Sequence, residues 1–421
     1  MVREGPSLAP QSQRARRGAL SPPRLSIVVL PFANLSRDPE QGYFVDGITE
    51  SLTTDLSRIN GSFVIARNSA FSYQGKVSDV RQVGQELNIR YALEGSVQRS
   101  GNRIRVNVQL IDAKTSQQLW AERFEKPVAD LFEMQDENVS RLARTLGVQL
   151  IVAEARRAGR SLHPDATELN FQGLACLYKG VAPEHLTQAR DFFERALAID
   201  LRNVEALIGM ATVDLTLGAS LLVEDRAACL LATETNAIKA LSLDPDHAKA
   251  HRILGGVYIF TNRAGQGIAE CEQALTLDCN LADAHGAIGI GKYFMGRAAE
   301  TENHILEALR LSFRDMVAHR WMHIVGMANI HLDSDVEAVD WLRRSIETNR
   351  NFPPSYFWLP AALGLLGALD DARTAAKAGL ALDPSFAIRR VLVSQSSDNP
   401  IFLAGRERVG AGMRLAGVPE G

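Results

Sequence analysis

Apolar residues in the first third of the chain switch repeatedly between the period of a strand and the period of a helix. Apolar residues at every second position, or in short β-branched runs, predict strands, and those at every third or fourth position predict amphipathic helices. Their order, β-α-β-α-β-β-β-α, predicts a small domain with a mixed sheet. The predicted strands are Leu25–Phe32, Phe63–Ala66, the two strands of a hairpin that turns at Ser100-Gly101-Asn102, and Gln118–Glu125. The predicted helices are Tyr43–Ile59, a helix marked by Val80, Val83 and Leu87, and Leu131–Val152. Ser78 or Asp79 is expected to cap the second of these helices.

From Asn170 onward, helical spacing takes over and one short pattern of a small residue, apolar residues and a polar end recurs. The last residues of its six copies are 44, 34, 34, 37 and 34 positions apart. A 34-residue period with helix-turn-helix content is the signature of tetratricopeptide (TPR) repeats, and this part of the chain resembles that family. The copies are Ala196–Asp200, Ala240–Asp244, Ala274–Asp278, Ala308–Ser312, Ser345–Asn349 and Gly379–Asp383.

The stretch Ala237–Tyr258 shows why the pattern has this form. Ala240 is small enough for two helices to approach each other, and Pro245 ends the second helix of a pair. Gly255 and Tyr258 match positions in the first helix of the repeat motif. The stretch therefore contains the end of one helix pair and the beginning of the next.

Several copies depart from this pattern. Cys279, Phe313 and Arg350 replace the terminating proline, and Pro360 takes the place of a small residue in a first helix. About ten extra residues lengthen the second repeat around Leu217–Asp225. We expect these copies to be irregular in pitch.

Six repeats exceed the three or so that are needed to bury a continuous core, so a solenoid from Asn170 to about Arg390 is predicted. The resemblance implies a right-handed superhelix with a concave groove lined by the first helix of each pair. Arginine and aromatic side chains there would suit a peptide or helix carrying a carboxylate, and alternatively Trp321 and Trp358 pack between neighbouring repeats. The residues carried over to the groove are Lys249, Arg252, Asp283, Arg320, Trp321, Phe357 and Trp358.

Five separated motifs occur in order within residues 25–150: Ser26–Ser36, Asp38–Gly47, Val64–Ser69, Tyr91–Val97 and Leu119–Glu122. Together they resemble the TolB amino-terminal-type domain. In proteobacteria, such domains lie between a class III adenylate or guanylate cyclase, or a winged-helix module, and tetratricopeptide repeats. The resemblance implies the fold of this region rather than a defined molecular role.

The chain is thus predicted to be α+β overall, with a small mixed α/β sheet domain followed by an all-α TPR superhelix. We expect a disordered basic linker over 1–24, the TolB-like domain over 25–158, about six TPR-like repeats over 167–390 and a capping segment over 391–421. The linker has five arginines against one acid, and the capping segment includes the apolar stretch Leu392–Met413.

Composition narrows the functional classes. A net charge of −3 over 421 residues shows no basic excess, which disfavours direct nucleic-acid binding. The four cysteines, Cys176, Cys229, Cys271 and Cys279, contain no CxxC pair, so a zinc or redox site is not predicted and a reducing compartment is favoured. The beginning of the chain lacks the layout of a secretory signal, and a cytoplasmic location is expected.

One segment tests the assignment to a soluble class. From Ala206 to Val223 only Asp214 is charged, and the length approaches that of a membrane span. A charge in the middle of a span costs about 2.5–3.5 kcal/mol, and a repeat helix accounts for the same residues. We therefore expect no membrane span.

Two motifs suggest chemistry that their context does not support. Gly286–Lys292 matches the first seven positions of a phosphate loop, but Tyr293 replaces the Ser or Thr and the segment lies on a predicted helix. His319 and His323 are four residues apart and could ligate a metal, but with no third ligand evident they are interpreted as helix-surface histidines. No catalytic residue, metal or cofactor is predicted.

Polar residues in the α/β domain form a second candidate site. Asp46-Gly47, Arg67 and Glu94 are placed by the sequence at the ends of elements, where small ligands often bind in α/β folds. The alternative is that they serve as caps and turn residues.

The sequence favours a non-enzymatic scaffold in which the TPR groove binds a protein or peptide partner. The α/β domain would serve as a sensing or docking domain. One alternative is the regulatory portion of a truncated or split class III cyclase, because only some 24 residues precede the first strand and cyclase motifs are not found. Another is a component of a transcriptional regulator whose DNA-binding domain is absent. The partner would then be a cyclase chain or a DNA-binding chain.

Overall fold

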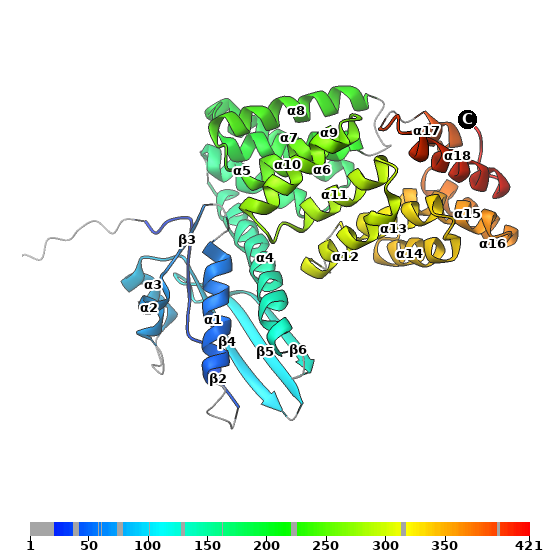
Figure 1. The fold of residues 1–421 in the computed structure, drawn as a ribbon. Helices are drawn as coiled ribbons and strands as arrows, with labels where there is room; N and C mark the ends of the chain where they lie inside the picture. Colours follow the sequence, from blue (N-terminus) through cyan, green and yellow to red (C-terminus); the bar gives the residue numbers. More distant parts are fainter. Residues whose placement is uncertain are drawn as a thin grey trace, which may run out of the picture. The chain divides into compact units, whose positions relative to one another are not determined.

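The computed structural model describes residues 21–36, 42–57, 59, 61–73, 79–100, 102–127, 131–161, 163–219, 225–312, 317–393 and 396–421. By its internal contacts, the chain divides into two compact units, Met1–Gln135 and Asp136–Gly421. The first unit holds a mixed sheet with short helices, and the second is built from helices (Figure 1). The predicted α+β class is confirmed, and almost all of the expected linker lies outside the described residues.

The first unit is organised around its sheet. Its strands are β1 (Leu25–Val29), β2 (Ala33–Asn34), β3 (Ser62–Val64), β4 (Tyr91–Ser100), β5 (Arg103–Asp112) and β6 (Gln118–Pro127). Their order is β3-β1-β4-β5-β6, with β2 paired to β4. Strand β1 is parallel to β3 and β4, whereas β4, β5 and β6 form an antiparallel meander.

Helices cover both faces of β1, which explains why all five of its residues are buried. They are α1 (Gly42–Ser57), α2 (Arg67–Phe71) and α3 (Val80–Leu87). Helix α1 contacts β1 and is held by buried residues such as Leu52, whereas Val28 of β1 clusters with Ala70 of α2 and Val83 of α3. The predicted hairpin is confirmed, while β2 and α2 are too short to produce a periodic signal.

Helix α3 has the predicted cap at Asp79, whose side chain accepts a hydrogen bond from the Arg81 N–H at 2.9 Å. The alternative cap, Ser78, lies outside the described residues. The cap fixes where the chain enters the helix that covers the Val28 face of the sheet.

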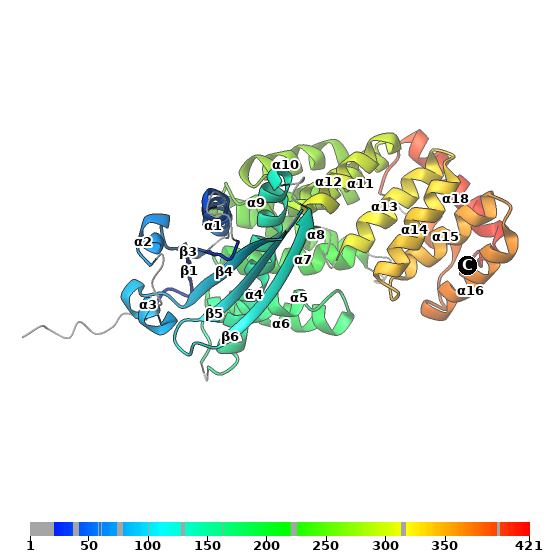
Figure 2. The same cartoon turned by 90° about the horizontal axis from the view of Figure 1, so that it is seen from below.

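Six consecutive helix pairs make up most of the second unit (Figure 2). The first helices of the pairs are α5 (Ala166–Leu177), α7 (Val204–Ala219), α9 (Ala248–Phe260), α11 (Ala282–Phe294), α13 (Ala318–His331) and α15 (Pro353–Leu365). The second helices are α6 (Pro183–Ile199), α8 (Arg226–Leu243), α10 (Ala264–Leu277), α12 (Thr301–Leu311), α14 (Asp335–Thr348) and α16 (Leu369–Leu382). Helix α4 (Leu131–Ala158) precedes them, a 3-10 turn (Ala298–Glu300) leads into α12, and α17 (Ile388–Leu392) and α18 (Pro400–Leu415) follow.

All six second helices end in the same way. The residue after each has φ between −147° and −135°, and its N–H bonds the carbonyl of the small residue four positions earlier. Each of these small residues is buried, as close approach of two helices requires. They are Ala196, Ala240, Ala274, Ala308, Ser345 and Gly379.

Copies that lack the terminating proline end as regularly as the others. The Asp278 carboxylate accepts the Asn280 N–H at 3.0 Å, and the Asn349 side chain accepts the Asn351 N–H at 3.0 Å. Such turns compete with helix continuation, and one also forms beside Pro384, where the Asp383 carboxylate accepts the Ser385 N–H at 3.2 Å. These two helix ends are regular, whereas the expected irregularity in pitch stays a prediction, and the third such position, Phe313, lies outside the described residues.

The apolar run that resembled a membrane span begins within α7. Its single charge, Asp214, is buried and accepts a hydrogen bond from Arg190 of α6. Burial raises the pKa of Asp214, and Arg190 opposes this shift. Within the described ranges, no helix has both the length and the apolarity to cross a membrane.

The chain's last helix does more than cover the last repeat. Helix α18 contacts α15 and α13, which are the first helices of the sixth and fifth pairs. Its residue Phe402 also meets the rings of Tyr293 and Phe294 on α11, in the fourth pair. The expected cap therefore reaches back across three repeats.

The close approach of paired helices gives a stability prediction. A Cβ atom at Gly255 of α9 would lie 2.6 Å from the Gly267 carbonyl oxygen of α10 and 2.6 Å from the Cys271 Sγ. Because backbone cannot move aside cheaply, Gly255→Ala should lower the free energy of unfolding by about 1–3 kcal/mol in urea denaturation.

A matched control lies on the partner helix. At Gly265 an added Cβ would meet no atom within 4 Å, so Gly265→Ala should be neutral or stabilising by about 0.5–1 kcal/mol. Equal destabilisation by both substitutions would contradict the assigned helix contact.

Candidate partner-binding groove

The first helices form one continuous surface of the solenoid. Each first helix contacts the next one along the chain, and no comparable contacts join consecutive second helices in the described part. A stack whose first helices lie closer together than its second helices must curve toward the first helices. We call this side, formed by α5, α7, α9, α11, α13 and α15, the inner surface.

Four of the predicted groove residues are polar and lie on first helices. Lys249 is exposed, and Arg252, Asp283 and Arg320 are half-buried. The side chains of Lys249, Arg252 and Arg320 make no hydrogen bond or ion pair with any other described residue. Within the described part, three cations on this surface therefore form no direct ion pair, although carboxylates lie near two of them.

Charges from several repeats meet at Lys249. Its pKa is raised most by Tyr178, which follows α5, and further by Glu205 of α7 and Asp278 beyond α10. Burial acts in the opposite direction, as does Arg252. Lys249 thus lies where protein surrounds the side chain although solvent still reaches it, as expected inside a groove.

Arg320 is the most enclosed of the three cations. Burial lowers its pKa, the nearby Asp283 carboxylate acts against this shift, and its Nε is buried without a hydrogen-bond partner. A buried guanidinium nitrogen without a hydrogen-bond partner is unfavourable, although the Asp283 carboxylate lies near enough to act on Arg320.

Electrostatic interactions link these residues into a strip. Burial raises the pKa of Cys271 to about 12, and both Arg252, which lowers it, and Asp283, which raises it, act on this thiol. Arg320 in turn acts on the neighbouring His323. The strip therefore runs along the inner surface from α9 through α11 to α13.

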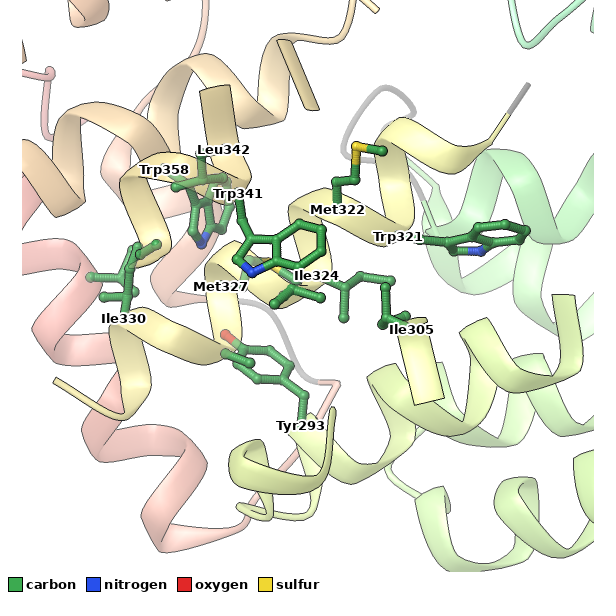
Figure 3. Packing of buried hydrophobic residues seen from close by; sticks show 14 of the residues in the cluster. Tyr293, Ile305, Trp321, Met322, Ile324, Met327, Ile330, Trp341, Leu342 and Trp358 are labelled. Atoms are coloured by element: carbon green, nitrogen blue, oxygen red, sulfur yellow. The ribbon is translucent and has the colours of Figure 1, made fainter. Parts of the chain in front are cut away.

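The predicted aromatic groove residues lie in the core. Trp321 is 4% exposed and lies against Gly286 of α11, and Phe357 is 0% exposed and stacks on Phe386 at 3.5 Å between ring centroids. Trp358 is 7% exposed and belongs to the same apolar cluster as Trp321 (Figure 3). These side chains pack within and between repeats, which was the alternative interpretation.

The two histidines of α13 are buried rather than on the helix surface, contrary to expectation. The Ser355 hydroxyl lies 3.1 Å from the His323 Nδ1, and the Asn349 side-chain nitrogen lies 3.3 Å from the His319 Nε2. Ser345 joins this network by donating to the His319 carbonyl at 2.6 Å. Among the described residues, no group of three potential metal ligands is found.

The phosphate-loop-like segment is helical, as expected, because it lies within α11. Its Lys292 forms an ion pair with Glu300 at 3.2 Å. Gly286 contacts Trp321 rather than open space. The glycines of this segment serve helix packing.

The four candidate residues of the α/β domain are not brought together by any interaction in the described part. Asp46 and Gly47 lie inside α1, and Glu94 lies inside β4, where it accepts a hydrogen bond from Gln109 at 2.9 Å. Placing these three at the ends of elements was wrong, because they lie within the helix and the strand that the periodicity itself predicted. Arg67 does begin α2 and pairs with Glu50 at 3.8 Å.

Sequence reasoning missed the acidic and phenolic part of the groove. Glu205, Lys249 and Asp283 are each the second residue of a first helix, in α7, α9 and α11. Applying the repeat register one copy earlier would have found Glu205. Tyr178 and Asp278 follow helix ends, where the register gave no reason to select them.

Comparisons with known proteins address each part of the chain. The second domain of HilA/YgeH-like transcriptional regulators matches residues 23–142. The TolB-like resemblance of nearly the same residues stays a prediction. A protein of Rhizobium meliloti named putative adenylate cyclase 3 is 43% identical over 221 residues, which cover 51% of this chain and 36% of that relative. The chain thus spans about a third of the length of this relative.

Solved TPR-containing structures are similar at low identity. A thermophilic TPR protein of Thermus thermophilus is 17% identical, with a TM-score of 0.38, and the match covers 47% of this chain and 98% of that one. The Cut9-Hcn1 hetero-tetramer of the APC/C is 15% identical, with a TM-score of 0.47, over 63% of this chain and 49% of that one. The repeat assignment rests on the six helix pairs themselves.

Acid should destabilise the repeat unit through His323. Burial first, then His319 and Arg320, lowers the pKa of His323 from 6.5 to about 3. The unfolded chain binds a proton here below about pH 6.5, and the folded chain does so only near the lowered value. Stability conferred by the neutral ring is therefore lost as the pH falls through this window.

In His323→Asn, the loss of unfolding free energy between pH 6 and pH 4 should be smaller than in the wild type by up to about 1.4 kcal/mol per pH unit. Urea midpoints at several pH values measure it, with exposed His163→Asn as the control. Parallel pH profiles for wild type and His323→Asn would refute the effect.

Proposed function

We propose that this chain is a non-enzymatic interaction scaffold whose inner TPR surface binds a protein segment carrying carboxylates. The observation that carries the proposal is a set of three cations on one surface whose side chains form no hydrogen bond or ion pair among the described residues, Lys249, Arg252 and Arg320. No cofactor is assigned, and the expected setting is the cytoplasm.

The chemistry of the strip favours a particular kind of segment. Arginine presents a planar fork of donors that matches a carboxylate, and the enclosed position of Arg320 strengthens such a bond. Asp283 lies between Arg252 and Arg320 and would repel a continuous acidic run. A segment with two separated acidic residues therefore fits better than a polyacidic tail.

A second proposal concerns the partner's identity. The 43% identity to a putative adenylate cyclase favours a role as the regulatory portion of a class III cyclase system, acting with a catalytic chain. In this case the scaffold positions or restrains that chain.

The purified chain should form no cyclic AMP or cyclic GMP from ATP or GTP with Mg²⁺ or Mn²⁺. This is expected because the aspartate-containing loops that hold metal in class III cyclase domains are not found in this sequence. Turnover that survives repurification would overturn the assignment as a scaffold.

A third proposal is favoured by the match of residues 23–142 to a domain of transcriptional regulators. The chain would then act with a DNA-binding subunit. For the α/β domain we propose docking rather than recognition of a small ligand, because Asp46, Gly47, Arg67 and Glu94 make no shared contact among the described residues.

Charge reversal in the groove should abolish partner binding. Arg252→Glu removes one end of the strip and should reduce partner recovery at least about tenfold, the effect of losing one charge-assisted hydrogen bond. The measurement is quantitative mass spectrometry of proteins recovered on the immobilised chain.

The matched control is Lys239→Glu, an exposed charge reversal on the second helix α8. A partner of the groove is recovered by the wild type and the control but not by Arg252→Glu. Equal recovery by all three proteins would contradict the proposed site.

A further inference from the structure

The C-terminal helix α18 lies on the same set of helices that forms the inner surface. Phe402, near its start, meets the rings of Tyr293 and Phe294 edge-on, each at 5.3 Å between centroids, and lies 5.6 Å from the His331 ring. These three rings belong to the last turns of α11 and α13. An aromatic side chain is thus held in a three-sided aromatic site built by two repeats.

Small residues let α18 approach the repeats closely. A Cβ atom at Gly405 would lie 2.2 Å from the His331 ring, and one at Gly412 would lie 2.3 Å from the Ala361 carbonyl oxygen of α15. Both glycines face the repeats, whereas Ala411 is exposed. The helix therefore has one side matched to α13 and α15.

A cation fixes the register of α18. Arg408 makes two hydrogen bonds to Asp335, at 2.7 and 2.6 Å, and a third to the Ile330 carbonyl at 3.0 Å. Its Nε also lies 2.6 Å from Asp333. Paired donors of this kind are specific in direction, so sliding by one turn would break all of them.

The segment that precedes α18 lies beside the third and fourth repeats rather than beside the last one. The Ser397 hydroxyl donates to the Phe294 carbonyl at 2.6 Å, and the Asp398 N–H donates to the Asn262 side chain at 3.2 Å. Asn399 then caps the helix by accepting the Ile401 N–H at 2.9 Å. Helix α18 thus begins beside the third and fourth repeats and runs back toward the sixth.

We propose that α18 is an intramolecular ligand of the groove. It occupies the inner surface at the carboxyl-terminal halves of α11, α13 and α15, so these positions are closed to a partner in the intact chain. Lys249, Arg252 and Arg320, near the beginnings of α9 and α13, stay open. Release of α18 extends the groove over the last three repeats and exposes a site for a helix.

The occupied site defines the helix that it accepts. Reading along α18, the contacts are an aromatic residue at Phe402, a glycine three residues later, an arginine three residues after that and a glycine at 412. A competing helix needs the same aromatic, small and basic face. This helix differs from the acidic segment that we propose for the open part of the inner surface. The inference rests on the proposed function only where it concerns the access of that acidic partner.

The test uses the full chain with a protease recognition sequence replacing residues 394–395, and a labelled synthetic peptide of residues 396–421. After cleavage, the natural fragment should remain bound on size exclusion, and the labelled peptide should exchange into the cut protein but not into the uncut protein. Peptide with Arg408→Glu should bind at least about tenfold more weakly. Gly412→Leu should abolish binding, while Ala411→Leu should leave it unchanged.

Three results would overturn the proposal. They are equal uptake of peptide by cut and uncut protein, equal binding of the Gly412→Leu and Ala411→Leu peptides, and loss of the cooperative unfolding transition when the fragment is removed. The last result would make α18 part of the core rather than a ligand. Because Arg252→Glu should not affect peptide uptake, failure of the proposed partner site can be distinguished from failure of this inference.

Discussion

Close approach between paired helices at small residues is the constraint on which the solenoid depends. Six buried positions, from Ala196 to Gly379, lie where a second helix crosses its partner, and each also supplies the carbonyl that ends the helix hydrogen bonds. One residue type thus sets both the spacing and the end of a helix. Consecutive first helices contact each other more than consecutive second helices do. The stack therefore curves toward the first helices, which form its inner surface.

The proposed partner chemistry lies on this inner surface, whereas apolar side chains fill the core. The strip of Lys249, Arg252, Asp283 and Arg320 lies toward the beginnings of the first helices, and α18 lies on their carboxyl-terminal halves. On the proposed assignment, a polar partner site and an apolar site occupied by α18 divide the inner surface along its width. Burial lowers the pKa of Arg320, and the nearby Asp283 carboxylate opposes this shift.

Periodicity predicted the architecture well, because each repeat carries the same pattern of small and apolar residues. Helix ends were predictable from the recurring pattern, including those at Asp278 and Asn349, where a side-chain turn forms and no proline follows. The groove's polar residues followed from the repeat register, but Trp321, Phe357 and Trp358 could not be placed from spacing alone. Whether an aromatic side chain on a first helix faces solvent depends on its neighbours, such as Gly286 and Phe386. The path of α18 depends on contacts across more than 70 residues, which no local pattern records.

Hydrogen exchange of the full chain with and without a bound partner tests the central claim most directly. The account predicts slowed exchange in the beginnings of α9, α11 and α13, with unchanged exchange in the second helices and in α18. Protection confined to second helices such as α8 and α10, with no change in α9 and α13, would contradict a partner site on the inner surface.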